Sequence, residues 1–218
     1  MTRAPATTYP VNLDLTGQRV LVVGGGRVAA RKVAGLLRAG AVVTVVAPDA
    51  VADIADDPDV RWHRREYRRG EAASYRLVFT ATNDPAVNAQ VARDCRAANV
   101  FVNSADDPAN CTFALPAVVH RGHLQLAVST NGRSPAFAAW LRRRLDAQIT
   151  EAHARLVDLL GEARDEARSR FGTSEHPGWA DVLDDELVAL VSAGRDDDAR
   201  ARIRRALGLT DPVQEVVS

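Results

Sequence analysis

A glycine-rich turn in the first third of the chain fits the pattern G-x-G-x-x-A. Its residues are Gly24, Gly25, Gly26, Arg27, Val28 and Ala29. The turn follows an apolar run and precedes a segment with helical periodicity, which is the context that such a turn needs. Gly24 would allow the tight turn, Gly26 would let a pyrophosphate approach the backbone, and small Ala29 would let the helix pack close to the strand. The first free N–H groups of the helix would then meet the phosphates, so the pattern predicts a dinucleotide site. The alternative is a glycine-rich turn without a ligand.

The end of the next predicted strand is where an acidic residue usually binds the adenosine ribose. Pro48 occupies that position here, and Asp49 follows one residue later. Asp49 could still accept hydrogen bonds from the ribose hydroxyls, and its charge would repel a 2′-phosphate, which favours NAD over NADP. The alternative is that Asp49 caps the next short helix, in which case backbone groups at Pro48 and Asp49 would line the ribose pocket.

Polar residues also follow two later predicted strands. Thr82 and Asn83 come after the strand at 76–81 and could contact the nicotinamide half of the dinucleotide, although turn and cap chemistry explains them equally well. Asp106 comes just after the strand at 100–103, where ligands of open α/β sheets gather. Its position suits a catalytic carboxylate; the alternative is a structural aspartate at the start of a loop.

The elements that would position these residues alternate between strands and helices. Strands are expected at 19–24, 41–47, 60–63, 76–81 and 100–103, and helices at 27–39 and 84–98. Asp84 and Pro85 suit the N-cap and first position of the second helix. This order predicts an α/β fold with a Rossmann-type, doubly wound parallel sheet.

The pattern changes at about residue 112. Two strands at 112–120 and 124–130 suggest an antiparallel hairpin, and Ser134-Pro135 opens a helix that runs to about 149. Further helices are expected at 150–170, 178–194 and 196–207. We therefore predict a Rossmann domain over 1–111, a hairpin-plus-helix region over 112–149 and an all-helical region over 150–218.

Composition excludes several classes of protein. Lys+Arg and Asp+Glu are both 28, so the zero net charge argues against a general nucleic-acid binder. The sequence contains no run of 18 apolar residues, so no membrane-spanning helix is predicted. The two cysteines, Cys95 and Cys111, are too few for a disulfide framework and form no CxxC pair, so no permanent metal site is expected. These features favour a reduced, cytoplasmic compartment.

Several short motifs together resemble one family. They are GGGRVAARK at 24–32, GAVVTVVAP at 40–48, ATND at 81–84, VN at 87–88, VNSADDP at 102–108, CTF at 111–113, PA at 116–117, RG at 121–122 and AVSTNGRSP at 127–135. Their order and spacing from about residue 9 to 149 resemble the precorrin-2 dehydrogenase and sirohydrochlorin ferrochelatase family, the N-terminal module of siroheme synthases. The region from about 150 resembles the family only loosely.

The resemblance implies an oxidoreductase that uses NAD to oxidise the tetrapyrrole precorrin-2 to sirohydrochlorin in siroheme, and so porphyrin-type, biosynthesis. It also implies that Fe2+, or Co2+, can then be inserted as a transient metal substrate, a ferrochelatase (lyase) step. The key carboxylate of the family falls on Asp106, and the cofactor contacts fall on Arg27, Val28, Pro48 and Asp49. A general base is a sensible role for Asp106, since both steps release protons.

The resemblance also bears on substrate binding and assembly. Carboxylates of the substrate need polar or cationic partners, and the candidates are Asn103, His120, Arg121 and Ser134, with Arg133 and Arg142 as further possibilities. Each has a structural alternative, such as a hairpin-turn arginine or a histidine packed beside its strand. In this family the hairpin and helix over 112–149 form a homodimer, so the resemblance implies one here, and the marginal stability of an isolated two-stranded hairpin is compatible with it.

Three other functions remain to be weighed. The first is a dehydrogenase without chelatase activity, which carries the same motifs. The second is a non-catalytic NAD-sensing module, which has no need for the loop at 103–108 or the segment at 121–135. The third is a short-chain or hydroxy-acid dehydrogenase, which is disfavoured because no Tyr-x-x-x-Lys pair exists and the only lysine is Lys32.

Overall fold

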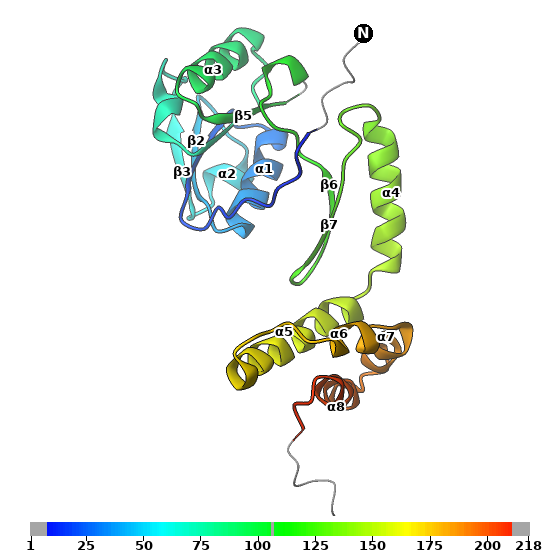
Figure 1. The fold of residues 1–218 in the computed structure, drawn as a ribbon. Coiled ribbons are helices and arrows are strands. Elements are labelled where there is room, and N and C mark those ends of the chain that lie inside the picture. Colours follow the sequence, from blue (N-terminus) through cyan, green and yellow to red (C-terminus); the bar gives the residue numbers. More distant parts are fainter. Residues whose placement is uncertain (1–7, 106, 211–218) are drawn as a thin grey trace, which may run out of the picture. The chain divides into compact units, whose positions relative to one another are not determined.

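The first half of the chain forms a five-stranded parallel sheet in the computed structural model, which describes residues 8–105 and 107–210 (Figure 1). The strands are β1 (Arg19–Val23), β2 (Val42–Ala47), β3 (Val60–Arg64), β4 (Leu77–Thr80) and β5 (Phe101–Ser104). Their order is β3-β2-β1-β4-β5, and all four pairings are parallel. The predicted doubly wound α/β sheet is therefore confirmed.

Helices cover both faces of this sheet. Val20 and Val22 of β1 pack in one core with α1 (Arg27–Arg38) and α2 (Ala52–Ala55). Leu21 and Val23 face the other way and pack in a second core with α3 (Pro85–Ala97) and the short 3-10 helix η1 (Glu71–Ser74). Because successive side chains of a strand point to opposite faces, a strand buried on both sides must be apolar throughout, which explains the continuous apolar run in the sequence.

The strand register brings the loops of interest to one edge of the sheet. Val23 pairs with Val46 on one side and with Thr80 on the other, and Thr80 pairs with Ser104. Starting from β1, the chain first adds β2 and β3 on one side of the sheet and then adds β4 and β5 on the other side. The order therefore reverses between β1 and β4, and the crevice at such a switch point is where open α/β sheets bind ligands.

The chain divides into two compact units, Met1–Leu115 and Pro116–Ser218. The hairpin of the second unit consists of β6 (Ala117–Arg121) and β7 (Leu124–Val128), so its first strand begins later than the predicted start at 112. The reason is that Thr112 belongs to the first unit. Its N–H donates to the carbonyl of Val102, and its hydroxyl accepts from the N–H of Val102. The 3-10 helix η2 (Pro108–Asn110) lies just before it.

The rest of the second unit is helical. Its helices are α4 (Pro135–Gln148), α5 (Glu151–Phe171), α6 (Gly178–Val182), α7 (Asp185–Ser192) and α8 (Asp196–Ala206). The prediction of a single helix over 178–194 is wrong, because the helix is interrupted at Leu183 and Asp184. Asp184 has an extended backbone, and its side chain accepts a hydrogen bond from the N–H of Leu187, which starts a new helix.

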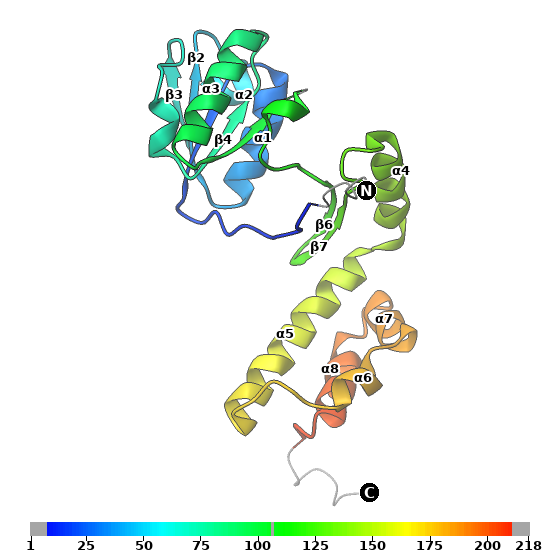
Figure 2. The same ribbon diagram turned by 45° about the horizontal axis from the view of Figure 1, so that its top comes forward.

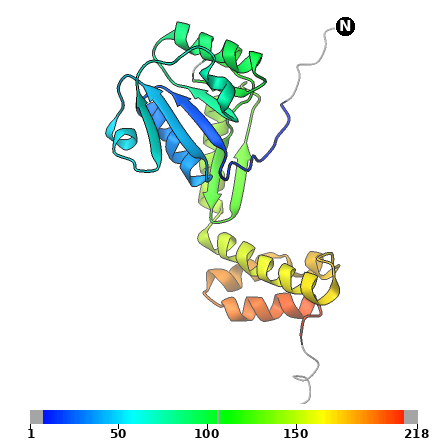
Figure 3. The same cartoon turned by 90° about the vertical axis from the view of Figure 1, so that its left-hand side faces the viewer.

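Helices α5, α7 and α8 surround one apolar core, with Leu159, Leu187 and Ile203 among its buried residues. α8 lies alongside α5 in Figures 2 and 3. Arg200 and Arg204 of α8 pair with Glu162 and Glu166 of α5 along this contact. In the part of the chain that the structure describes, no helix is both long and apolar enough to cross a membrane.

Candidate active site

The three glycines of the turn meet different physical demands. Gly24 has a φ of 117°, and a Cβ there would overlap the carbonyl of Ala81 after β4. Gly25 allows a second close approach, since a Cβ there would overlap the carbonyl oxygen of Asp49 after β2. A Cβ on Gly26 would meet no atom within 4 Å. Gly24 and Gly25 therefore serve packing between loops, whereas the space above Gly26 is open to a ligand.

The start of α1 has the features of an anion site. Gly26 is the N-cap and supplies no side-chain hydrogen bond, and no acidic residue lies in the first turn. Arg27 and Val28 are exposed there. Unpaired N–H groups and the positive end of the helix dipole favour a phosphate at such a terminus. The open face at Gly26 and this helix start together fit the pyrophosphate of a dinucleotide.

The ribose end of the predicted site is formed by the loop after β2. Pro48 and Asp49 are exposed, and Val51 is the N-cap of α2, so Asp49 does not cap that helix. The loop is held by the N–H of Val51, which donates to the carbonyl of Gly25 at 2.9 Å. Asp49 therefore stands beside the glycine turn, with its carboxylate at the surface.

Sequence reasoning missed Arg64 at this end of the site. Arg64 ends β3, pairs in register with Ala47, and its Nε donates to the carbonyl of Pro48 at 3.4 Å. It is exposed. The weak strand predicted at 60–63 pointed to the right segment, but only the parallel register places this guanidinium next to the β2 loop.

A cleft of about 380 Å³ opens at the switch point of the sheet. It is lined by Val28, Ala81, Thr82, Asn83, Pro85, Asn88, Ala105 and Asp107. These residues come from the first turn of α1, the loop between β4 and α3, the start of α3 and the loop after β5. Asp106, the predicted catalytic residue, lies outside the described residues, but its two neighbours in the chain line this cleft.

Thr82 and Asn83 differ in how they are bound. The Thr82 hydroxyl donates to Asn88 Oδ1 at 2.8 Å and accepts from the N–H of Asp84 at 3.2 Å, so it takes part in the turn that starts α3. Asp84 caps that helix by accepting from the N–H of Ala86, as predicted. Asn83 is exposed at the cleft wall. Of the two predicted nicotinamide contacts, Asn83 is the one whose side chain faces solvent.

Asn103, a predicted substrate ligand, is nearly buried at the end of β5. It is 9% exposed, and both ends of its amide bind within the protein. Its Oδ1 accepts from Lys32 Nζ at 3.2 Å, and its Nδ2 donates to the carbonyl of Phe113 at 3.1 Å.

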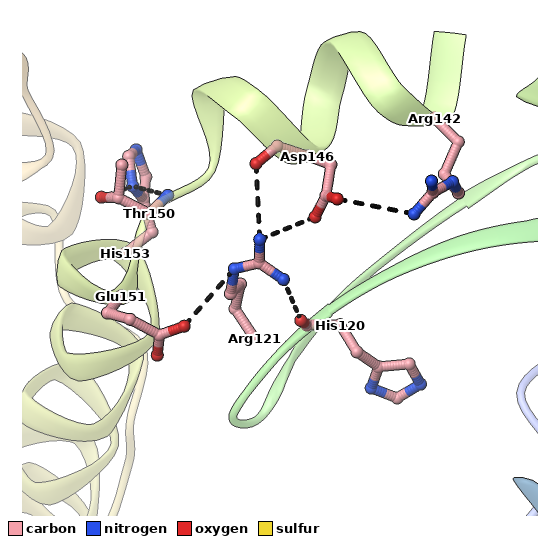
Figure 4. A network of polar contacts seen from close by, with 7 residues as sticks. All are labelled: His120, Arg121, Arg142, Asp146, Thr150, Glu151 and His153. Atoms are coloured by element: carbon pink, nitrogen blue, oxygen red, sulfur yellow. Dashed lines mark hydrogen bonds and ion pairs between the residues drawn. The ribbon is translucent and has the colours of Figure 1, made fainter. Parts of the chain in front are cut away.

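The other predicted substrate ligands lie in the second unit, and Figure 4 shows two of them, His120 and Arg121. The guanidinium of Arg121 donates to Asp146 of α4 at 2.7 Å and to the carbonyl of His120 at 2.8 Å, and it pairs with Glu151 of α5 at 3.4 Å. The imidazole of His120 is exposed and points away from this cluster. Ser134 caps α4 by accepting from the N–H of Phe137 at 3.2 Å. The candidates are thus divided between the two units.

Beside Arg121, the Asp146 carboxylate also binds Arg142 at 3.5 Å, and Thr150 and His153 form a capping box at the start of α5 (Figure 4). Arg121 therefore ties the hairpin to both helices. Among residues 8–105 and 107–210, no group of three or more His, Cys, Asp or Glu side chains could hold a metal ion.

Comparison with known proteins identifies the family. Residues 11–117 match a family described as putative NAD(P)-binding, and residues 121–148 match the sirohaem biosynthesis protein central family. The siroheme synthase of Psychrobacter sp. (strain PRwf-1) is 35% identical over 208 residues, which cover 93% of this chain and 43% of the relative. The chain belongs to the siroheme synthase family. It corresponds to the N-terminal module of that family, and its first unit is an NAD(P)-binding domain.

Further relatives agree. The siroheme synthase of Nitrosospira multiformis is 36% identical over 91% of this chain and 44% of its own length, and that of Pseudomonas putida is 37% identical over 94% and 45%. The chain thus spans less than half the length of these curated relatives. A solved structure of SirC, a precorrin-2 dehydrogenase, has a TM-score of 0.66 and 29% identity, and the match covers 93% of this chain and 98% of that one.

Proposed function

We propose that the chain oxidises precorrin-2 to sirohydrochlorin with NAD. One observation carries this proposal: the cleft at the switch point is lined both by Val28, which follows the glycine turn, and by Ala105 and Asp107 of the loop after β5. The similarity to SirC over nearly the whole of that chain supports the same activity. The family match leaves the choice of dinucleotide open, and the exposed carboxylate of Asp49 favours NAD over NADP.

The reaction removes a hydride and a proton from precorrin-2, giving sirohydrochlorin, NADH and H+. NAD+ supplies the hydride acceptor. Gly24 would shape the turn, while Gly26, Arg27 and Val28 would hold the pyrophosphate at the start of α1. Pro48 and Asp49 would bind the ribose, and Thr82 and Asn83 would border the nicotinamide. The cleft would exclude part of the solvent from the carbon that loses the hydride.

Asp106 is proposed as the base that takes the proton. A carboxylate that stays ionised at neutral pH can accept a proton as the hydride leaves. Asp106→Ala should abolish precorrin-2 oxidation while the variant folds and binds NADH. Asp59→Ala is the matched control, because Asp59 is an exposed aspartate just before β3, at the edge of the sheet opposite the cleft. Near-normal oxidation by Asp106→Ala would rule out this role.

Among the predicted ligands of the substrate carboxylates, Asn103 is already bound at both ends of its amide within the first unit, which leaves His120, Arg121 and Ser134 of the second unit as candidates. His120 has the most accessible side chain of the last three, whereas Arg121 already neutralises Asp146. The proposal therefore expects His120→Ala to raise the KM for precorrin-2 with little effect on folding, and Arg121→Ala to destabilise the second unit as well.

Metal insertion is a second proposed step. Fe2+, or Co2+, would replace two pyrrole protons of sirohydrochlorin, and the same carboxylate could accept them in turn. The name of the relatives, siroheme synthase, is consistent with this step. A dehydrogenase without chelatase activity is the alternative.

One anaerobic experiment tests these proposals together. The purified chain is incubated with precorrin-2 and NAD+, the tetrapyrrole and NADH absorbances are followed, and Fe2+ or Co2+ is then added. We expect NADH to form in step with sirohydrochlorin. Absence of any change with NAD+, in protein shown to bind NADH, would favour the NAD-sensing alternative, and oxidation without metal insertion would identify a dehydrogenase alone.

The proposed enzyme is a homodimer, formed through the hairpin and α4, and it acts in the cytoplasm without nucleic-acid or membrane partners. Phe137 and Trp140 of α4 support the dimer, since their rings stack at 5.4 Å and are 52% and 47% exposed. An exposed aromatic pair of this kind is typical of an interface.

A further inference from the structure

The only lysine of the chain, Lys32, lies between the cofactor helix and the end of β5. Its ammonium donates to Asn103 Oδ1 at 3.2 Å and lies 5.1 Å from the centre of the Phe79 ring of β4. Lys32 is one helical turn after Val28, so both project from the same face of α1. Val28 lines the cleft.

Asn103 passes this contact on to residues 111–113, which follow the loop after β5. Its amide Nδ2 donates to the carbonyl of Phe113 at 3.1 Å and lies 3.8 Å from Cys111 Sγ. Because Asn103 is nearly buried, loss of either partner would leave an unsatisfied polar group in the interior.

Cys111 joins the two ends of that loop. Its sulfur accepts from the N–H of Ser104 at 3.2 Å, and its thiol is within hydrogen-bond distance of the carbonyls of Ser104 and Asp107, both at 3.3 Å. One side chain thus holds the last residue of β5 and a residue that lines the cleft. Lys32, Asn103 and Cys111 form a continuous set of contacts from α1 to both ends of the loop.

We propose that Lys32 is a positioning residue for the reaction: through Asn103 and Cys111 it fixes Ser104 and Asp107, at the two ends of the loop after β5, relative to helix α1 and so relative to the proposed dinucleotide site. This inference rests on the proposed dehydrogenase function. Hydride transfer is sensitive to small displacements of the reacting groups, whereas dinucleotide affinity depends on the glycine turn. The contribution of Lys32 therefore belongs to kcat rather than to cofactor binding.

The test is Lys32→Met, which keeps the aliphatic stem and removes the ammonium. We expect kcat for precorrin-2 oxidation to fall by about tenfold or more, since misplacement of reacting groups is costly. The KM for NAD+ should stay within about twofold of the unchanged chain, because uniform binding is untouched. Lys32→Arg, which keeps a cationic donor, should recover most of kcat. Arg31→Met removes the same charge from the neighbouring, exposed position of α1 and should leave kcat unchanged.

Cys111→Ala provides a second readout. If both residues act through one set of contacts, the fold-loss of kcat in the double variant with Lys32→Met should be much smaller than the product of the fold-losses of the two single variants. Should Lys32→Met fail to fold, Lys32→Gln, which keeps a donor without the charge, replaces it in the same comparison. Equal kcat values for Lys32→Met and Arg31→Met would overturn the proposal. So would a parallel loss of kcat, NADH affinity and melting temperature that Lys32→Arg does not relieve. An inactive but folded wild-type chain would instead refute the dehydrogenase function on which the proposal rests.

Discussion

At the scale of single residues, the glycine turn shows that one motif can combine unlike requirements. Gly24 and Gly25 are imposed by neighbouring backbone, whereas Gly26 borders open space. A methyl group at these positions should therefore have different consequences, although the three glycines are adjacent in the chain.

Gly26→Ala should fold with a change in stability below about 1 kcal/mol, because its extended backbone suits any residue and the added methyl meets nothing. It should weaken NADH binding, since the methyl would occupy the space proposed for the pyrophosphate. Gly25→Ala should lower the melting temperature as well, because its methyl overlaps the Asp49 carbonyl. NADH fluorescence titration and thermal denaturation check both. Unchanged NADH affinity in Gly26→Ala would count against the pyrophosphate assignment.

Asp49 gives a prediction about cofactor choice. Asp49→Ser removes the carboxylate that would repel a 2′-phosphate and leaves Arg64 beside Pro48, so kcat/KM with NADP+ should rise by about tenfold relative to NAD+. Steady-state kinetics with both dinucleotides measure this ratio. If the ratio does not move, Asp49 has no part in discrimination.

At the scale of elements, the first unit depends on a hydrogen-bonded carboxylate that ties α3 to the segment before β4. Asp94 of α3 accepts from the N–H of Gly70 at 2.7 Å, from the Tyr67 hydroxyl at 2.8 Å and from Gln90 at 2.7 Å. Burial by itself raises the pKa of Asp94, but these hydrogen bonds outweigh it and hold the pKa below its ordinary value of 3.8. The pKa of Tyr67 is raised, first by burial and then by its bond to Asp94.

The lowered pKa fixes the direction of a pH effect. A carboxyl whose pKa is lower in the folded state stabilises the fold above its unfolded pKa, and that contribution is lost as the pH falls through the folded value. Asp94→Asn should therefore lower the unfolding free energy by about 1–3 kcal/mol at pH 7. The difference from wild type should shrink below pH 3.8. Urea denaturation at a series of pH values tests this, and a difference that is constant with pH would contradict the charge-based explanation.

At the scale of the whole molecule, each unit has its own apolar cores. The two cores of the first unit lie within residues 15–113, and the helical core of the second lies within 152–209. All the proposed dinucleotide contacts belong to the first unit. Calorimetry of the full chain should therefore show two unfolding transitions. NADH should raise the melting temperature of only one of them, because a ligand stabilises the unit that binds it. A single transition that NADH raises as a whole would show that the units unfold together.

Assembly is the second property at this scale. Trp140→Glu should convert the predicted dimer to a monomer, because a charge replaces an aromatic ring of the exposed pair on α4. Leu183→Glu is the control, since Leu183 is 52% exposed in the helical part of the second unit. Light scattering at micromolar concentration measures both. A monomeric wild-type chain would remove the homodimer from the proposal.

Much of the fold and part of the candidate site could be read from the sequence because the signals are local. Continuous apolar runs gave the buried strands, and the side-chain oxygens of Asp84 and Ser134 cap the helices that they were expected to cap. The glycine turn was recognisable because strand, turn and helix are contiguous in the chain. The same local reasoning failed at Leu183 and Asp184, where apolar periodicity continues through a break.

Contacts between distant segments were decided only by tertiary structure. Gly25 must lack a side chain because of the backbone of Asp49. Arg64 is placed by the register of β3 on β2. The proposed role of Lys32 depends on Asn103, which is 71 residues further along the chain. Each depends on which strands pair and in what register, and a residue's own sequence neighbourhood carries no record of that. The sequence determined which chemistry the chain could perform; packing of the sheet and its helices decided which side chains are free to take part in it and which hold the others in place.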